Sequence, residues 1–263
     1  MTDWLELCRA AAADVDAVLE RLPTRAEREP VVGEGLGGDE TTAIDRAAEE
    51  AIIARVRAAA GAIVSEEVGR VGGSALPLLV VDPIDGSLNA KRGIPFFSIS
   101  IAVAEGETMD DVVFGFVHDF GSREEWVARR GEGAWLNGEP LGAVRPKDEV
   151  EILSFEATRT SLVAEEAPKV ADLAYRLRIM GSLALSLCHL AAGRVDAVCS
   201  LKPARSVDIA AAQLLCSEVG LALDLFDVEE SFGAAPLDLE QRSRVVAAGT
   251  TAVCRRIADA LSA

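Results

Sequence analysis

Several residue types that build common functional sites are scarce in this chain. Its five cysteines are odd in number and include no CxxC pair, so the sequence predicts neither a thiolate zinc site nor a disulfide framework. We expect all five to be small buried apolar groups: Cys8, Cys188, Cys199, Cys216 and Cys254. The only two histidines, His118 and His189, stand far apart. His189 falls in an apolar helical pattern, which suggests a place in the core or behind a site.

Long apolar runs and a basic leader are also missing. No stretch approaches the roughly 20 apolar residues that a membrane-spanning helix requires. The first 22 residues form an acidic amphipathic helical pattern, whereas a secretory signal begins with basic residues and continues with an apolar segment. We therefore expect a cytoplasmic protein with no membrane partner.

Positive charge is the third shortage. The 26 Lys and Arg residues stand against 43 Asp and Glu residues, which gives a formal net charge of −17, and only four of the basic residues are lysines. A surface of this sign repels nucleic acid, so we expect no nucleic-acid partner. An anionic substrate would need local positive charge to bind. The acidic, lysine-poor composition is also typical of a cytoplasm at high salt, where such charge is screened, and suggests a halophilic source.

Apolar residues make up half of the 263 positions, enough for one large domain or two closely packed halves. In the first half, residues 1–145, we expect helices over 1–22 and 43–60, separated by a glycine-rich loop at 31–42. Strand-like runs lie at residues 62–65, 76–81, 97–104 and 111–118. Asn137-Gly138 indicates a hairpin. This half is therefore predicted to combine helices with a sheet rich in hairpins.

The second half, residues 146–263, alternates strands with helices, a pattern typical of a sheet covered by helices. Strands are expected at residues 150–155, 175–179, 195–200, 221–226 and 244–249. Helices are expected near 161–174, over 182–192 and 207–219, and at the C-terminal end. The sequence thus predicts an α/β protein whose two halves are joined by a short connection near residue 146.

The segment DPIDGS, residues 82–87, directly follows an apolar run. A buried carboxylate is costly unless a positive group meets it, so the segment is either a solvated type I turn or a cation site. Aspartates three positions apart do not fit an EF-hand loop, which needs oxygens at alternate positions, nor the two-apart spacing of aspartyl-phosphate phosphatases. Asp82, Asp85 and the carbonyl of Ile84 can instead converge as hard ligands suited to Mg²⁺. The amides of Gly86 and Ser87 would point outward, as in phosphate sites.

Two further acidic positions accompany this segment. Glu66 and Glu67 follow the strand-like run at 62–65, where an ordinary solvated turn would look the same. Asp208 opens a helix, where a carboxylate is favoured by the helix dipole without any function. Neither position is informative alone. Together they form an ordered set in the chain: a Glu pair, then DPIDGS, then VDIAA.

This ordered set resembles the Mg²⁺-dependent, lithium-sensitive inositol monophosphatase and fructose-1,6-bisphosphatase superfamily, and is most similar to the archaeal enzymes that act on both substrates. The resemblance covers nearly the whole chain. The segments that carry it are GDETTAID, SEE, VVDPIDGSLN, GIPFFSISIAV, RGEGAWLNG, RIMGSLALSLCHLAAGRVDAV and VDIAAAQLLCSEVG. It implies a layered α-β-α-β-α sandwich, a homodimer, and two or three Mg²⁺ ions per site, for which Mn²⁺ can substitute.

The resemblance also implies a set of metal ligands. Glu66, Asp82 and the carbonyl of Ile84 would bind the first Mg²⁺. Asp82, Asp85 and Asp208 would bind the second. Two such ions, about 3.5 to 4 Å apart, would clamp a phosphate ester from both sides.

Catalytic and phosphate-binding roles follow from the same resemblance. Asp45 and the hydroxyl of Ser87 would orient and deprotonate the attacking water beside Glu66. The amides of Gly86 and Ser87 would hold the phosphate. In-line attack needs positioning and charge stabilisation more than covalent help, so no phospho-enzyme is implied.

The chain departs from the family in the substrate region, where Val207 replaces a tryptophan before the DIAA aspartate. Six residues of the second half are candidates for contact with the substrate: Arg176, Arg178, Gly181, Ser182, Lys202 and Arg205. The cations among them would grip a second phosphate if they reach the site. As alternate residues of one strand, Arg176 and Arg178 would equally well face solvent.

These observations favour a Mg²⁺-dependent phosphatase that binds a phosphorylated small molecule and hydrolyses fructose 1,6-bisphosphate, myo-inositol 1-phosphate or both. The alternatives are a phosphatase of 3′-phosphoadenosine phosphate or NADP, and a weakly catalytic partner-binding regulator on the same fold. The intact acidic set argues against the regulator. Residues 33–40 are expected to be poorly ordered without metal and to close over the occupied site, because glycine gives backbone freedom. Alternatively, they are a long surface connection.

Overall fold

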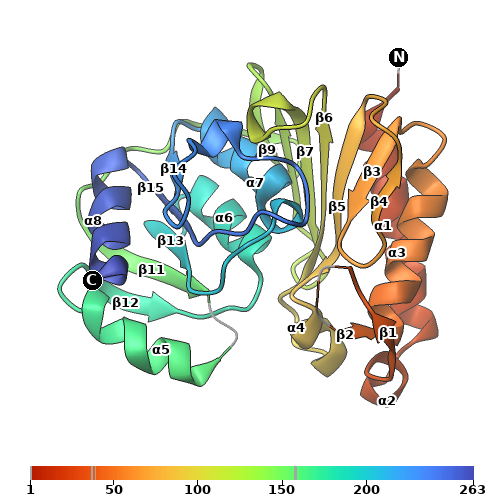
Figure 1. Ribbon diagram of the computed structural model, residues 1–263, viewed down its shortest axis with the longest axis horizontal. Helices are drawn as coiled ribbons and strands as arrows, with labels where there is room; N and C mark the ends of the chain where they lie inside the picture. The colour runs from red at the N-terminus through yellow and green to blue at the C-terminus, as the bar shows by residue number, and fades with distance from the viewer. Residues whose placement is uncertain (1, 37, 39, 157–158) are drawn as a thin grey trace.

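The structure, a computed structural model, describes residues 2–36, 38, 40–156 and 159–263. Its helices and sheets form five layers, and Figure 1 shows them side by side from the N-terminal helices to the C-terminal helix. The order of the layers is α-β-α-β-α, so the predicted α/β sandwich is confirmed.

The larger sheet has eight strands in the order β10-β9-β8-β7-β6-β5-β3-β4. Only β3 and β5 are parallel; the other neighbours are antiparallel. In chain order the strands are β3 (Ala62–Ser65), β4 (Gly69–Gly72), β5 (Leu78–Asp85), β6 (Ser98–Ala104), β7 (Val112–Asp119), β8 (Glu125–Arg129), β9 (Gly133–Leu136) and β10 (Glu139–Leu141). Leu78 and Val80 of β5 belong to one core cluster, and Leu79 and Val81 to the other. Because both faces are covered, this strand reads as a continuous apolar run.

Helices cover the two faces of the larger sheet. On one face lie α1 (Trp4–Arg21) and α3 (Ala43–Val56), and on the other lie α6 (Leu183–Ala191) and α7 (Ser206–Glu218). The last two helices belong to the second half of the chain, so one core cluster joins both halves. The division into residues 1–145 and 146–263 stays a prediction.

The smaller sheet has five strands in the order β12-β11-β13-β15-β14. They are β11 (Val150–Glu156), β12 (Ala174–Arg178), β13 (Ala197–Ser200), β14 (Ala222–Leu225) and β15 (Val245–Ala248). β11 runs parallel to β12 and β13, and β15 is antiparallel to β13 and β14. The outer face packs on α8 (Thr251–Ser262), with α5 (Thr160–Glu166) beside it in Figure 1.

Some predicted boundaries differ from the structure. The helix expected near 161–174 ends as α5 at Glu166 and continues as a 3₁₀ turn, Ala167–Val170, because Pro168 cannot donate the backbone hydrogen bond that a helix interior needs. The short strands β4 and β8 were not predicted. Four short helical segments complete the description: α2 (Arg25–Arg28), α4 (Ser87–Arg92), and the 3₁₀ helices Met109–Asp111 and Phe232–Ala234.

The glycine-rich segment was predicted to be a loop but contains two short strands. β1 (Val31–Glu34) and β2 (Glu40–Thr42) pair as an antiparallel hairpin, and the poor order without metal and the closure expected for residues 33–40 stay predictions. Gly37 and Asp39, which this expectation also included, lie outside the described residues. The five cysteines are free and buried, as predicted. None of the helices in the described ranges has the length and apolar character needed to cross a membrane.

Candidate active site

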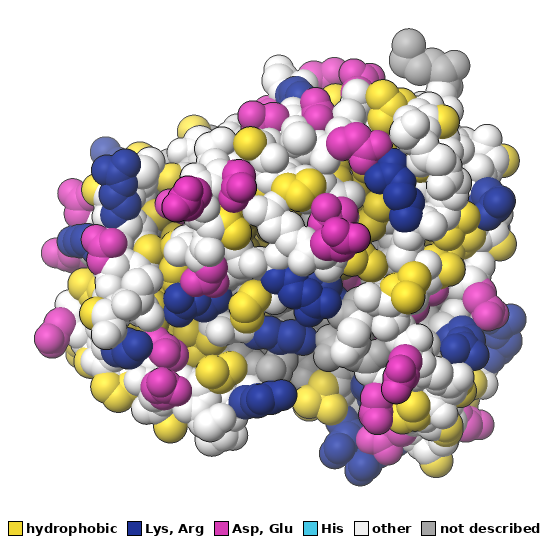
Figure 2. Space-filling view, in the orientation of Figure 1, with side chains coloured by type: hydrophobic (Ala, Val, Ile, Leu, Met, Phe, Trp, Pro, Cys, Tyr) yellow, Lys and Arg dark blue, Asp and Glu magenta, His cyan; other side chains and the backbone are white. Residues whose placement is uncertain are grey.

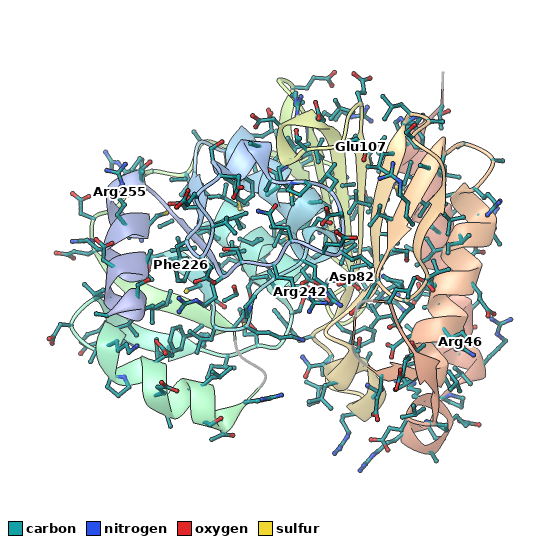
Figure 3. The ribbon with its side chains drawn as sticks, in the orientation of Figure 1. Arg46, Asp82, Glu107, Phe226, Arg242 and Arg255 are labelled. Atoms are coloured by element: carbon teal, nitrogen blue, oxygen red, sulfur yellow. The ribbon has the colours of Figure 1, made fainter. Side chains whose placement is uncertain are left out.

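Asp82 and Asp85 lie at the carboxyl end of β5, and Figure 3 places Asp82 between the two halves. The register with β6 shifts between these two residues, so the strand bulges there. Asp82 is 2% exposed and accepts a hydrogen bond from the amide of Ile84 at 3.0 Å. Gly86 follows with a φ of +92°. A side chain at this position would come within 3.0 Å of the carbonyl oxygen of Gly181, so glycine is needed where the halves approach each other.

Asp85 reaches from the first half to the start of α6. Its carboxylate accepts hydrogen bonds from the hydroxyl of Ser182 and from the amide of Ala184, the latter at 2.7 Å. A carboxylate is favoured there because the first amides of a helix lack partners within the helix. Buried Glu156 holds the same segment by accepting from the amide of Gly181 at 2.8 Å. The structure thus brings three predicted residues, Asp85, Gly181 and Ser182, together.

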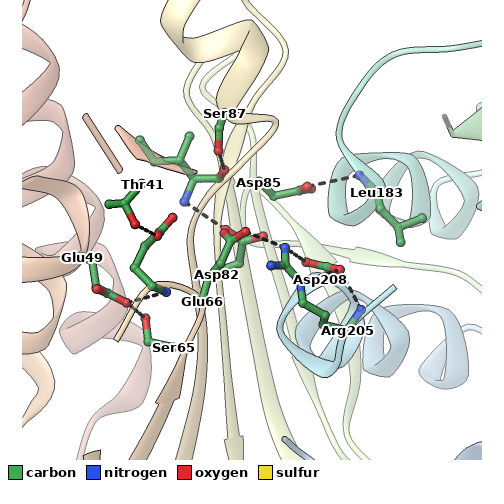
Figure 4. A network of polar contacts seen from close by, with 12 residues as sticks. Thr41, Glu49, Ser65, Glu66, Asp82, Asp85, Ser87, Leu183, Arg205 and Asp208 are labelled. Carbon is green, nitrogen blue, oxygen red and sulfur yellow. Dashed lines mark hydrogen bonds and ion pairs between the residues drawn. The ribbon is translucent and has the colours of Figure 1, made fainter. Parts of the chain in front are cut away.

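Glu66 lies in the turn between β3 and β4, and Glu49 of α3 holds this turn in place. The buried carboxylate of Glu49 accepts from the hydroxyl of Ser65 at 2.5 Å and from the amides of Glu67 and Val68, both at 3.1 Å (Figure 4). Because three donors of one turn converge on one carboxylate, the backbone that carries Glu66 is fixed.

Asp45 stands in the first turn of α3, behind the β1–β2 hairpin. Its Oδ2 accepts from the amide of Thr42 at 3.1 Å and from the hydroxyl of Thr42 at 2.5 Å. Its Oδ1 is buried and has no hydrogen-bond partner within the described part of the chain. A buried acceptor of this kind calls for a water molecule or a cation. Thr41, the neighbouring hairpin residue, donates its hydroxyl to the carboxylate of Glu67.

The guanidinium of Arg205 lies among the predicted metal ligands (Figure 4). Its Nη2 is 2.5 Å from Oε1 of Glu66 and 3.0 Å from Oδ1 of Asp208. The backbone amide of Arg205 also donates to Asp208 at 2.7 Å, at the start of α7. The Arg205 side chain is only 8% exposed. It therefore joins a carboxylate of the first half to a carboxylate of the second.

Burial and mutual repulsion disfavour ionised carboxylates in this cluster. Burial is the main cause that raises the pKa of Glu66 to about 7 and the pKa of Asp85 to about 7. The pKa of Asp82 is also well above its ordinary value, because Asp82 is buried and faces Glu66 and Asp85. Burial lowers the pKa of Arg205, but Asp208 and Glu66 outweigh that effect, so the pKa is raised and the guanidinium stays charged. A cation that entered the cluster would relieve this repulsion.

The carboxylates are close together but do not surround a single point. Within the described ranges, no three Asp, Glu, His or Cys side chains are arranged to hold a metal ion. The reason is that Glu66 and Asp208 face Arg205, whereas Asp85 faces α6. The donor chemistry nevertheless fits Mg²⁺, since the set consists of enclosed carboxylate oxygens. Asp45, whose Oδ1 has no partner among the described residues, acts electrostatically on Glu67, the neighbour of Glu66.

The predicted phosphate-binding residues open the short helix α4. The hydroxyl of Ser87 donates to the carbonyl oxygen of Ile84 at 2.9 Å, so it is tied to the carbonyl that the sequence predicts as a metal ligand. Gly86 precedes the helix in the left-handed conformation. The roles predicted for these three residues stay predictions.

The predicted substrate cations lie in different places. Arg176 pairs with Glu151 at 2.9 Å, at the amino end of β11, whereas the cluster adjoins the carboxyl end. The structure therefore does not bring Arg176 to the site. Arg178 is exposed and donates to the carbonyl oxygen of Leu177. Lys202 is half-buried, in the segment that leads to Arg205.

Three further residues near the site were not predicted. Glu49 lies four positions after Asp45, so helical spacing places the two on one face, a signal that was available in the sequence. Glu156 gave no such signal, because the amides it accepts from are 24 and 25 positions away. Figure 2 shows Lys and Arg side chains gathered at the centre of the face where the halves meet, and Figure 3 places Arg242 there. Arg242 approaches Gly38, since a Cβ on that glycine would lie 3.6 Å from its Nη2.

Comparison with known proteins places this geometry in a family. A sequence model described as the inositol monophosphatase family matches residues 3–262. The chain belongs to the inositol monophosphatase family. Family members are phosphatases, so the protein is a hydrolase of phosphoric monoesters.

Individual family members resemble the chain over most of its length. A fructose-1,6-bisphosphatase/inositol-1-monophosphatase of Methanocaldococcus jannaschii is 30% identical over 82% of this chain and 84% of its own. A protein of the same description from Thermococcus kodakarensis is 32% identical over 83% of this chain and 82% of its own. A solved inositol monophosphatase-fructose 1,6-bisphosphatase superimposes with a TM-score of 0.83 at 27% identity, over 99% of this chain and 100% of its own. The family resemblance predicted from the sequence is thereby confirmed.

Proposed function

We propose that the protein uses Mg²⁺ to hydrolyse a phosphate monoester of a sugar or polyol, with fructose 1,6-bisphosphate and myo-inositol 1-phosphate as the candidate substrates. The observation that carries this proposal is the close approach of four carboxylates, those of Glu66, Asp82, Asp85 and Asp208, with a single guanidinium paired to two of them. When ionised, the set holds an excess of three negative charges. An excess of this size in an enclosed place is costly unless cations offset it.

The four carboxylates and the carbonyl of Ile84 are the groups that would hold two or three Mg²⁺ ions, or Mn²⁺ in their place. When bound, the ions supply Lewis-acid polarisation of the phosphoryl group, activation of water and neutralisation of developing charge. This assignment is supported by the chemistry of the donors and by family membership.

The remaining residues would position the reactants. Asp45 would hold the attacking water and take its proton through Oδ1, because Oδ2 is already engaged by Thr42. The hydroxyl of Ser87 would turn from Ile84 toward the same water. The amides of Gly86 and Ser87 would hold phosphoryl oxygens, and Glu66 would stand beside the water as a metal ligand. The phosphoryl group would pass directly to water, with no covalent intermediate on the protein.

Substrate recognition would come from the second half of the chain. Gly181 and Ser182 lie at the start of α6, next to the 82–87 segment, where they would contact substrate hydroxyl groups. Lys202, Arg178 and Arg205 are the cations proposed to meet a second phosphate. The pairing of Arg176 with Glu151 does not support a role for Arg176 in this contact.

Phosphate release from a panel of substrates tests the proposal. The panel contains fructose 1,6-bisphosphate, inositol 1-phosphate, 3′-phosphoadenosine phosphate and NADP, with Mg²⁺ varied from zero to saturation. We expect turnover only with the metal, and the highest kcat/KM for one of the first two compounds. A preference for the nucleotides would support the alternative phosphatase, whereas no release from any compound would favour a partner-binding role.

We also propose that the protein is a cytoplasmic homodimer from a halophilic source. Large apolar side chains exposed on and beside α4 and on and after β12 support self-association: Leu88, Ile94, Tyr175 and Ile179. The formal charge of −17 supports adaptation to salt. Sedimentation equilibrium across a range of KCl concentrations measures the mass directly, and a monomer at all concentrations would contradict the dimer.

A further inference from the structure

Arg205 occupies the place where two of the proposed metal ligands meet. Its Nη2 lies within hydrogen-bond distance of Glu66 and Asp208, which come from different halves of the chain. Its side chain is almost fully enclosed. These contacts are charge-assisted hydrogen bonds, the strong kind in proteins.

The guanidinium and a metal ion compete for the same oxygen atoms. Mg²⁺ binds carboxylate oxygen at about 2.0 to 2.1 Å, and Oε1 of Glu66 is already 2.5 Å from Nη2 of Arg205. Two cations sharing one oxygen at such distances would repel each other strongly in an enclosed site. A metal ion that binds Oε1 of Glu66 and Oδ1 of Asp208 must therefore displace the guanidinium from these two atoms.

We propose that Arg205 is a displaceable counter-ion of the metal site. In the metal-free protein it pairs with Glu66 and Asp208, and it leaves both carboxylates when Mg²⁺ binds. This inference rests on the proposed function, because it assumes that the two carboxylates are metal ligands. Displacement would also make the guanidinium available to an anionic substrate beside the site.

The opposite role makes the opposite prediction. If Arg205 were a fixed brace that holds Glu66 and Asp208 in position for the metal, its removal would weaken metal binding, as loss of supporting contacts around metal ligands does. If Arg205 is a competitor, its removal strengthens metal binding. The sign of the change in Mg²⁺ affinity therefore separates the two roles.

Calorimetric titration with Mg²⁺ alone, without substrate, measures this sign. Arg205→Met removes the charge but keeps a long buried side chain. It also keeps the backbone amide of residue 205, which donates to the carboxylate of Asp208. We expect Arg205→Met to bind Mg²⁺ about tenfold or more tightly than the wild type, because one nearby positive charge is lost. Arg176→Met is the matched control, since Arg176 also pairs with a Glu, Glu151, but lies away from the cluster; its Mg²⁺ affinity should equal that of the wild type.

A measurement on the wild-type protein covers the case in which the variant fails to fold. In arginine-labelled protein, the Nε–H resonance of Arg205, a buried side chain, should shift or broaden during titration with Mg²⁺ as its carboxylate partners are lost. Weaker Mg²⁺ binding by Arg205→Met, or an Arg205 resonance that stays unchanged at saturating Mg²⁺, would overturn the inference while leaving the proposed function intact. A wild type that binds no Mg²⁺ would overturn both.

Discussion

Asp82 and Asp85 end the same strand but meet different partners. Asp85 accepts from donors at the start of α6, whereas Asp82 accepts one amide bond, from Ile84, and faces more like charge than opposite charge. The pKa of Asp82 is raised by burial first and then by Glu66 and Asp85. In the absence of metal, Asp82 is therefore a group whose charge destabilises the fold.

Asp82→Asn tests the negative charge at this position, because it keeps the shape of the side chain. The amide side chain keeps an oxygen that can accept from Ile84, but it loses the negative charge that a metal requires. We expect kcat/KM to fall by roughly two orders of magnitude or more, while the melting temperature of the metal-free protein stays equal or rises because repulsion is relieved. Asp110→Asn, at an exposed position in a 3₁₀ helix, is the control. Activity near that of the wild type at saturating Mg²⁺ would rule out Asp82 as a ligand.

Glu49 is expected to affect metal binding indirectly, by holding Glu66 in position. It touches Ser65, Glu67 and Val68 and so positions Glu66. Glu49→Gln weakens these bonds to neutral ones, and we expect the Mg²⁺ concentration for half-maximal activity to rise about tenfold, as typical for groups that support metal ligands. The value of kcat at saturating Mg²⁺ should change much less.

The neighbouring Glu50→Gln provides the matched control for this prediction, because Glu50 stands on the same helix but is exposed. Its Mg²⁺ dependence should match that of the wild type. If Glu49→Gln instead lowered kcat with no change in the Mg²⁺ requirement, Glu49 would not act by positioning Glu66.

At the residue scale, the ordered set of acidic segments predicted which carboxylates lie close together. The carboxylates of Glu66, Asp82, Asp85 and Asp208 do come together in space, although their roles as ligands stay predictions. The position of Arg205 between Glu66 and Asp208 could not be predicted, because it depends on how the two halves pack. Glu156 was missed because the amides that it accepts from, those of Met180 and Gly181, are distant in the sequence.

At the scale of elements, the β1–β2 hairpin connects the site to the surface. Thr41 of the hairpin donates to the carboxylate of Glu67, and the amide of Leu36 donates to the carbonyl oxygen of Glu67 at 2.9 Å. Arg242 approaches the same hairpin at Gly38 from the second half. The hairpin thus contacts the turn that carries Glu66 and lies close to both halves.

Amide hydrogen exchange tests whether this hairpin responds to occupancy of the site. We expect exchange in residues 31–36 and 40–42 to slow several-fold when Mg²⁺ and phosphate are added, because charge neutralisation at the Glu66–Glu67 turn stabilises the hairpin contacts. Thr41→Val removes the hydroxyl donor and should reduce this protection. Helix α8, on the outermost layer, is the internal reference. Equal exchange with and without the ligands would leave the hairpin as a surface connection only.

The elements that the sequence predicted well carry strong local signals. Strand β5 opens with a continuous apolar run, Leu78 to Val81, because both faces are covered, and α3 begins at a Thr42–Asp45 capping box. Short elements were missed because their stability comes from neighbours. Strand β4, with two glycines in four residues, forms only by pairing with β3, and β1 and β2 form only with each other.

At the scale of the whole molecule, carboxylates on the surface and carboxylates buried where the halves meet behave differently. Ion pairs on the surface lower the pKa of several carboxylates, such as Glu107 beside Arg70 and Glu124 beside Arg194. The cluster at the centre behaves in the opposite way, because the pKa values of Glu66, Asp82 and Asp85 are raised. Protons and metal ions therefore compete for the same groups near neutral pH.

This competition predicts how Mg²⁺ stabilises the protein at different pH values. Glu66 and Asp85, with pKa values raised to about 7, hold more protons in the folded than in the unfolded state between about pH 4 and 7. Their contribution to the stability of the metal-free protein is therefore lost as pH rises through 7. The half-buried histidines His118 and His189, whose pKa values are lowered by partial burial, act in the opposite direction, but their effect cancels when samples with and without Mg²⁺ are compared at one pH. We expect the rise in melting temperature caused by saturating Mg²⁺ to be small at pH 5.5 and to grow steadily up to pH 8, since an unprotonated carboxylate binds the metal.

Differential scanning calorimetry at constant ionic strength measures this rise in melting temperature. Asp82→Asn, which lacks one of the competing carboxylates, should show a smaller increase with pH. An equal rise in melting temperature at pH 5.5 and pH 8 would show that the buried cluster is not where Mg²⁺ binds.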